Sequence, residues 1–210
     1  MIKNYFLLIF LILSCQLFSQ EVYLNIGKNF TKYEYKNSFG QLNPNLQSGT
    51  GNFYEVGFTK PFTEEHFIYS AGLSLNDYNA IGGNSANSYR WDTKYLGLKG
   101  GLAYSFFPSE YNNLGQNLNF LLNAGLKGQF IIYGKQEIDG VYYDLVHNEE
   151  FSGLIVEPSL GFQLKYFLSS FWFLILGYNY CIGINVSSNS KEKLSFNTHQ
   201  IGVGFHFPLD

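Results

Sequence analysis

The chain has 210 residues, of which 46% are hydrophobic, 19% aromatic and only 14% charged, with a formal net charge of −3. About a quarter of the residues of a soluble domain are charged, so this chain has little charge with which to cover a water-facing surface. No internal run reaches the roughly 20 apolar residues of a transmembrane helix. A pI near 5.8 gives no basic footprint for nucleic acid. Composition therefore favours hydrophobicity that is spread over alternating strands.

The N-terminus has the pattern of a secretory signal peptide. Lys3 is basic, residues 5–13 are apolar, and Leu17-Phe18-Ser19 forms a cleavage site before Gln20. A lipoprotein signal at Cys15 is the alternative, since Ser14 is suitably small, but Leu13 fits that signal poorly. We expect a signal peptide at 1–19 and one domain at 20–210. Within that domain Cys181 is the single cysteine, so no intrachain disulfide is expected.

The stretch Leu118–Ile132 shows the pattern on which the rest of the chain varies. Every second residue is apolar apart from Gly128, and the residues between them as far as Gln129 are polar or small apart from Leu121. Period-two alternation of this length predicts a strand with two chemically opposed faces. At about 3.4 Å per residue such a strand is long enough to cross a bilayer when tilted.

Seven further segments show the same alternation in chain order. The eight strands are expected at about 22–35, 52–62, 67–78, 93–106, 118–132, 151–167 and 171–186, and at a last segment that ends at Phe207. Lys28 falls on the apolar face of the first strand, so either a bulge changes the register there or the lysine snorkels. Pro158 lacks a backbone donor, which predicts a bulge beside Glu157.

The arrangement of loops and aromatic residues favours a membrane barrel. An even number of antiparallel strands can close without a free edge. Long polar loops are expected at 37–51, 79–92 and 133–150, all after odd strands, and shorter turns mostly after even ones. Aromatic residues gather near the short turns, at Phe62, Phe67, Phe106, Phe107, Tyr166, Phe167, Phe171, Trp172, Phe173 and Phe207. A second group is expected to mark the opposite membrane interface, at Tyr33, Tyr35, Phe53, Tyr54, Tyr78, Trp91, Tyr95, Tyr133 and Phe151.

A soluble eight-stranded barrel of the lipocalin kind is the competing interpretation. Such a barrel has an apolar interior and a charged exterior. Here the polar faces hold mainly Gly, Ser and Asn, which is too little charge for a soluble surface, and the apolar faces carry side chains too large for a narrow lumen. The sequence therefore predicts an all-β, eight-stranded, antiparallel up-and-down transmembrane barrel.

The chain resembles the small eight-stranded outer-membrane barrels of Gram-negative bacteria, and most nearly the outer-membrane beta-barrel domain proteins common in Bacteroidota. The resemblance covers residues 20–210 and is most specific at H-Q-I-G-V-G-F-H-F, residues 199–207. That stretch is similar to the closing strand that the barrel-assembly machinery recognises. In the family the final aromatic residue often ends the chain, whereas Pro208-Leu209-Asp210 follow it here. The resemblance implies a location in the cell outer membrane, among its lipids and lipopolysaccharide.

The lumen of an eight-stranded barrel is about wide enough for its own side chains to fill. Six polar residues are expected to form a network there: Glu55, Lys99, Lys127, Glu157, Gln163 and Lys165. Charges in such a lumen must pair or pay a large desolvation cost, and Lys127 with Glu157 is the expected pair because their strands are adjacent. We expect a structural plug of ion pairs rather than a gated pore.

An enzyme is the main alternative to a structural, surface-interaction or porin-like barrel. A lipid A deacylase barrel carries His and Ser two residues apart on one strand face, and none of His66, His147, His199 and His206 has a Ser so placed. His147 lies among acidic residues of the longest loop, which is more often a solvated loop than a cation site. We therefore expect no catalytic residue, no metal and no cofactor. A subunit role in a secretion or gliding apparatus, with an envelope or surface partner, stays open.

Overall fold

The computed structural model describes residues 20–42, 46–62, 66–83, 88–107, 118–169, 171–187 and 193–209. The expected signal peptide and Cys15 lie outside these residues. The strands are β1 (Gln20–Lys36), β2 (Leu46–Pro61), β3 (Phe67–Gly83), β4 (Ser88–Ser105), β5 (Leu118–Ile138), β6 (Val141–Asp144), β7 (Ile155–Ser169), β8 (Trp172–Asn185) and β9 (Lys193–Leu209). Among the described residues, no helix is long and apolar enough to span a membrane.

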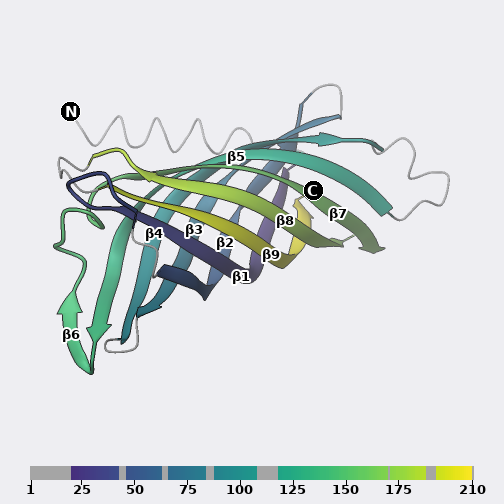
Figure 1. Cartoon of the computed structure of the whole chain (residues 1–210). Coiled ribbons are helices and arrows are strands. Elements are labelled where there is room, and N and C mark those ends of the chain that lie inside the picture. Colours follow the sequence, from purple (N-terminus) through teal and green to yellow (C-terminus); the bar gives the residue numbers. More distant parts are fainter. Residues whose placement is uncertain are drawn as a thin grey trace, which may run out of the picture.

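Eight of these strands form the closed antiparallel barrel that the alternation predicts. Each strand pairs with its neighbour in the chain, β9 pairs back onto β1, and β7 pairs with β5. The pairing of β4 with β5 completes the ring (Figure 1). The ninth strand, β6, is not part of the wall: it forms a hairpin with the end of β5 that projects beyond the barrel.

The two faces of the wall are chemically opposite, and their polarity is inverted relative to a soluble barrel. Along β5 the outward side chains Leu122, Leu126 and Phe130 are about half exposed, whereas Lys127 and Gln129 between them are fully buried. The same alternation holds in β1, where Leu24 and Ile26 face outward and Tyr23 faces the lumen. This is the surface that a hydrocarbon environment stabilises, because exposed apolar side chains meet lipid while backbone polar groups are satisfied in the closed ladder.

The strands extend further towards the long-loop end than hydrophobicity alone indicates. The loops expected at 37–51 and 79–92 are much shorter, because β2 already begins at Leu46 and β3 and β4 run on until Gly83 pairs with Ser88. The expected loop at 133–150 contains the end of β5 and all of β6. The part of a strand that extends beyond the membrane needs no apolar face. The polar ends of these strands therefore show no alternation of apolar and polar residues by which the sequence could reveal them. The strand expected from Phe151 begins instead at Ile155.

Two local expectations are resolved by the register. Pairing of β1 with both neighbours is continuous through Lys28, so no bulge is present, and the outward Lys28 Nζ donates to Asn52 Oδ1 at 2.7 Å. The bulge predicted beside Glu157 is wrong: β7 and β8 keep one register on both sides of Pro158, where the pairs at 157 and 158 are missing, and that ladder shifts register only between Phe167 and Ser169. Pro158 faces outward and is tolerated there because the strand pairs with β5 on its other side.

The aromatic residues behave differently at the two ends of the barrel. Near the short turns, Phe62, Phe67, Phe106, Tyr166 and Phe207 are 41–50% exposed and form an outward band as expected. Phe167 and Phe173 were expected in the same band, but they share the inward face with Lys165, and their rings pack 5.1 Å apart. At the long-loop end the expected band is mostly wrong, since the following residues are buried inside the barrel: Tyr33, Phe53, Tyr78, Trp91, Tyr95 and Phe151. Tyr54 does point outward, with 47% of its surface exposed. This end of the lumen is therefore filled with aromatic side chains.

Candidate functional site

The long-loop end of the lumen is closed by an aromatic cluster, which we call the cap. Its members are Tyr33, Leu46, Tyr78, Ala80, Trp91, Tyr95, Ile131, Leu145, Phe151, Ile155, Leu194 and Phe196. Trp91 packs edge-on against Tyr33 and Phe151, with ring centroids 5.3 and 5.0 Å apart, and the Phe196 ring lies tilted by 38° against Tyr78 at 4.5 Å. Aromatic pairs with this geometry stabilise by about 0.5–1.5 kcal/mol beyond their buried area. The cap thus seals the lumen at this end.

The cap includes a segment that enters the barrel mouth from outside the wall. Residues 145–154 follow β6, and they place Leu145 and Phe151 among the cap side chains at 1% and 3% exposure. The segment is anchored by Asn185 of β8, whose amide donates to the carbonyls of Glu150 and Ser152 at 3.1 and 2.7 Å. The Leu154 N–H donates to Ser187 Oγ at 2.6 Å. The loop is therefore a fixed part of the cap.

A polar layer crosses the lumen directly below the cap. Lys127 of β5 and Glu157 of β7 are register partners, and their Nζ and Oε1 atoms lie 2.6 Å apart at 1% and 0% side-chain exposure. Glu157 Oε2 also accepts hydrogen bonds from Tyr78 at 2.5 Å and from Gln129 at 3.1 Å. Gln200 Nε2 donates to Asn29 and Asn76, which ties β9 to β1 and β3. The layer connects side chains from opposite walls.

Two further charge pairs lie nearer the short-turn end. Lys99 Nζ meets Glu55 Oε2 at 2.6 Å, with little exposure of either side chain. At the mouth, Glu21 accepts from Lys165 at 2.5 Å and lies 3.0 Å from His206 Nδ1. Lys165 Nζ also lies 3.9 Å from the centroid of the Phe173 ring. Lys127, Lys99 and Lys165 are thus each paired with a carboxylate.

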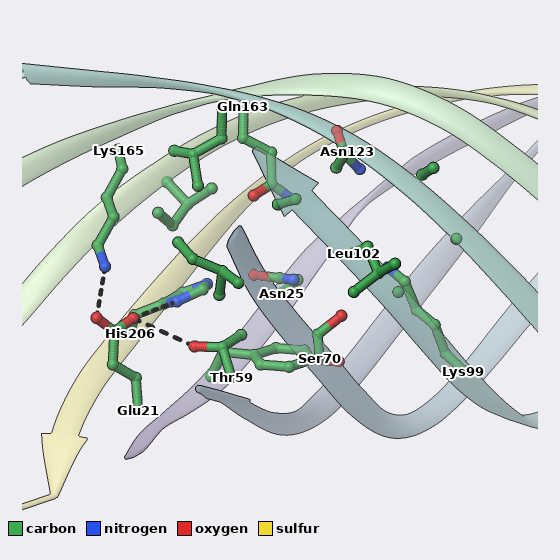
Figure 2. A pocket seen from close by; sticks show the side chains of 18 residues that line it. Glu21, Asn25, Thr59, Ser70, Lys99, Leu102, Asn123, Gln163, Lys165 and His206 are labelled. Atoms are coloured by element: carbon green, nitrogen blue, oxygen red, sulfur yellow. Dashed lines mark hydrogen bonds and ion pairs between the residues drawn. The ribbon is translucent and has the colours of Figure 1, made fainter. Parts of the chain in front are cut away.

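Between these pairs the lumen holds a cavity, which we call the chamber (Figure 2). Figure 2 shows Asn25, Asn123 and Gln163 around it, with Glu21, Lys165 and His206 at one side and Lys99 at the other. Apolar side chains complete the lining, among them Leu121 and Ile175. Its empty volume is about 600 Å³ when the space open to solvent is included. The described residues thus pack closely at the long-loop end of the lumen and surround a cavity towards the short turns.

All six residues of the predicted network face the lumen, but the structure distributes them over three levels. Lys127 and Glu157 belong to the polar layer, Glu55 and Lys99 form the next pair, and Lys165 lies at the mouth while Gln163 lines the chamber. The sequence argument missed Glu21, His206 and Tyr23, which line the chamber at its mouth. Because every second residue of a strand points to the same face, the sequence could have placed two of these residues in the lumen: His206 shares the inward face with Gln200, and Tyr23 shares it with Asn25.

The histidines are held in unrelated places. His199 faces outward, where its Nδ1 lies 2.8 Å from the hydroxyl of Tyr178, while His66 contacts the Ser105 carbonyl and stacks on Tyr104. His147 pairs with Asp144 at 2.5 Å in the exposed loop, and this bond, with the Val146 N–H, holds the pKa of Asp144 below its usual value. Within the described ranges no group of three or more His, Cys, Asp or Glu side chains could hold a metal ion.

The comparisons with known proteins support the fold. No protein-family model and no curated protein sequence matches the chain. The crystal structure of Neisserial surface protein A is similar, with a TM-score of 0.53, 13% identity, and coverage of 91% of this chain and 97% of that one. The outer membrane protein OprG from Pseudomonas aeruginosa is similar with a TM-score of 0.50, 12% identity, and coverage of 90% and 96%. The chain accordingly has the fold of the small outer-membrane β-barrels.

Proposed function

We propose that this protein is an integral, non-enzymatic outer-membrane β-barrel with a sealed lumen, which serves as a membrane-embedded support for a structural or surface-interaction role. The observation that supports this most is the closed cap above the fully buried Lys127–Glu157 layer. The apolar outer face supports placement in a lipid bilayer. Membership of the outer-membrane beta-barrel proteins common in Bacteroidota is part of the same proposal and rests on the sequence pattern.

Electrical recording in planar lipid bilayers tests the seal. The unaltered protein is expected to give no discrete conductance steps, because packed aromatic rings and paired charges among the described residues occupy this part of the lumen. Insertion is verified separately by the change in gel mobility that heating causes in detergent-resistant barrels. Reproducible unitary steps from the inserted, unheated protein would contradict the proposal and favour a porin-like role.

The non-enzymatic part of the proposal rests on the histidine geometry. His199 contacts Tyr178 on the lipid-facing side, and its neighbour Thr198 points into the lumen, where it contacts Thr31. A hydrolytic site needs a nucleophile, a base and an orienting acid within reach of one another, and His199 has no such arrangement among the described residues. His206 has an acid beside it, since its Nδ1 lies 3.0 Å from Glu21, but within the described part of the chain no nucleophile is hydrogen-bonded to its Nε2. Mass spectrometry of lipid A from cells that contain or lack the protein tests this point. A protein-dependent loss of an acyl chain would favour the lipid-modifying alternative.

The hairpin of β5 and β6 favours surface interaction over a purely structural role. Asp139 and Gly140 form its turn with φ of 49° and 83°, and positive φ at both central residues is what a type I′ hairpin turn requires. Beyond the turn, Val141, Tyr142 and Tyr143 are 51–65% exposed. Exposed tyrosines on a projecting loop are typical of recognition surfaces. In pull-downs from intact membranes, we expect the unaltered protein to recover a partner and the Y142S/Y143S variant to recover none. Equal recovery by the two proteins would show that the hairpin does not bind the partner.

Two partners follow from placement in the outer membrane. We propose that lipids, including lipopolysaccharide, surround the exposed apolar side chains of the wall. We further propose that the barrel-assembly machinery recognises residues 199–207 of β9, which is the strand that closes the ring against β1. A subunit role in a secretion or gliding apparatus is the alternative, and the pull-down from intact membranes addresses it directly.

A further inference from the structure

Lys28 is a charged side chain on the lipid-facing surface of the wall. It lies between the outward side chains of Ile26 and Phe30 on β1, and its register partner on β9 is Ile201. These three apolar neighbours are 41%, 42% and 54% exposed. A charge on the lipid-facing side of a membrane barrel is costly unless it has a partner or reaches the interface. The position of Lys28 therefore requires a partner for its positive charge.

The protein itself supplies Lys28 with a neutral partner. Lys28 Nζ donates to Asn52 Oδ1 at 2.7 Å, and the Asn52 amide donates to Asp77 Oδ2 at 3.4 Å. The Asp77 carboxylate is already paired with Lys94, whose Nζ lies 3.0 Å from Asp77 Oδ1. Among the residues that the structure describes, Lys28 forms no direct ion pair with a carboxylate. Two lysines thus share one carboxylate, which leaves this cluster with one positive charge in excess.

The charges next to this cluster do not remove the excess. Asp92 is close enough to act on Lys94, but the register partner of Asp92 on β5 is Lys135, so these two charges offset each other. Lys32 and Glu34, further along the outward face of β1, also carry one charge of each sign. A lysine ammonium has three N–H donors, and Asn52 accepts from one of them. Lys28 can therefore still donate to an anion from outside the protein.

Lys28 lies in the half of the wall that is nearer to the long-loop end. Phe207, in the outward aromatic band near the short turns, pairs with Val22 of β1. At about 3.4 Å per residue and a tilt of about 40°, the strand rises by ~15 Å from Val22 to Lys28, within an apolar band about 25 Å tall. The flexible stem of a lysine lets its ammonium extend further towards the headgroups. Because the long loops are extracellular in outer-membrane barrels, the anion that Lys28 meets belongs to the outer leaflet.

We propose that Lys28, held by Asn52, is a binding site on the outside of the wall for the phosphate group of an anionic lipid in the outer leaflet. The ammonium binds the phosphate, and the apolar side chains of Ile26, Phe30 and Ile201 contact the acyl chains of the same lipid. The site deepens the lipid contact proposed above and rests on the placement of the barrel in a membrane. It gives the wall a selectivity for one kind of headgroup, which apolar side chains alone do not provide.

Nuclear magnetic resonance of the methyl groups of the folded protein in uncharged maltoside micelles tests this site. Dioctanoyl phosphatidic acid is compared with dioctanoylglycerol, which has the same acyl chains but no phosphate, and with inorganic phosphate, which has no chains. We expect phosphatidic acid to shift the signals of Ile26 and Ile201 saturably. The signals of the lipid-facing Leu126 on β5 should change no more than they do with dioctanoylglycerol. Both comparison compounds are expected to bind at least tenfold more weakly than phosphatidic acid.

Matched variants assign the effect to Lys28. K28M removes the charge but keeps a flexible side chain that lipid tolerates, so it should weaken the binding of phosphatidic acid at least fivefold, whereas K28R should retain it. K135M is the control: it removes the same charge from the projecting hairpin, where Lys135 lies over the rings of Tyr133 and Tyr142. We expect K135M to bind phosphatidic acid like the unaltered protein.

Three results would overturn the site: equal binding of phosphatidic acid and dioctanoylglycerol, equally tight binding of inorganic phosphate, or undiminished binding by K28M. The comparison of the three compounds needs no variant, so it decides the matter even if K28M does not fold. A folded barrel without selectivity would refute this site alone. A chain whose gel mobility in the micelles does not change on heating would refute the membrane placement, and the site with it.

Discussion

Lys127 and Glu157 face each other across two neighbouring strands with almost no exposure to water. Removing an ion from water costs several kcal/mol even after the protein relaxes, so the attraction within the pair only partly becomes net stability. The additional bonds from Tyr78 and Gln129 to Glu157 explain how the charges are tolerated. The pair therefore fixes the register and packing of the lumen more than it adds free energy.

Replacing one partner should be far more harmful than replacing both. K127M leaves the Glu157 carboxylate buried and unpaired, so we expect it to lower the free energy of unfolding by about 3–5 kcal/mol. The double variant K127M/E157Q removes both charges and is expected to recover most of that loss. The measurement is equilibrium unfolding by guanidinium in detergent or lipid.

The pair at the mouth provides the matched comparison for this prediction. Lys165 and Glu21 retain 14% and 21% side-chain exposure, so K165M should cost clearly less than K127M. A K127M protein as stable as the unaltered one, or a double variant less stable than K127M alone, would show that the buried pair does not form in the membrane.

At the scale of elements, the segment 145–154 links the outer loops to the packing of the lumen. Phe151 contributes a buried ring to the cap, whereas Phe130 on β5 points to lipid with 55% exposure. Truncating a buried Phe typically costs about 3–5 kcal/mol because a cavity remains. F151A should therefore reduce the free energy of unfolding by an amount near this range and make the segment accessible to added protease.

The lipid-facing control for F151A is F130A. Lipid chains can fill the space that the missing ring leaves at Phe130, so we expect its cost to be less than half that of F151A. Protease resistance of residues 145–154 in F130A should equal that of the unaltered protein. Equal destabilisation by the two variants would mean that Phe151 does not pack inside the barrel.

Much of the element arrangement was predictable, and the errors have a common physical cause. Alternation identified the eight wall strands, their faces and the Lys127–Glu157 pair. The aromatic residues at the long-loop end were assigned by their height alone, although Tyr33 shares the inward parity of Tyr23, and Phe53 shares that of Glu55. Phe151 had no such signal, because it enters the lumen from a loop. Side-chain direction from a loop depends on tertiary contacts that a local pattern does not contain.

At the scale of the whole molecule, the outer surface should tolerate charge according to its depth in the bilayer. Leu126 lies midway along the apolar face of β5 and Ile81 near the long-loop end of β3, with 54% and 52% exposure. Arginine at the bilayer midplane of such a barrel costs about 2–4 kcal/mol, and near the interface about 0–1 kcal/mol. We expect L126R to be destabilised in this larger range and I81R in the smaller one, as measured by reversible unfolding from lipid vesicles. Equal costs would contradict the assigned depth.

The central claim is that the wall has an apolar outside and an inside that is polar and packed at the level of Lys127 and Glu157. Nitroxide labels placed singly at residues 120–132 of β5, in a C181S background, test it most directly through their collision rates with oxygen and with a water-soluble nickel chelate. The account predicts a period of two, with high oxygen accessibility at even positions such as 122, 126 and 130 and low accessibility to both reagents at odd positions such as 127 and 129. High oxygen accessibility at the odd positions instead of the even ones, or access of the nickel chelate to the even positions, would contradict it.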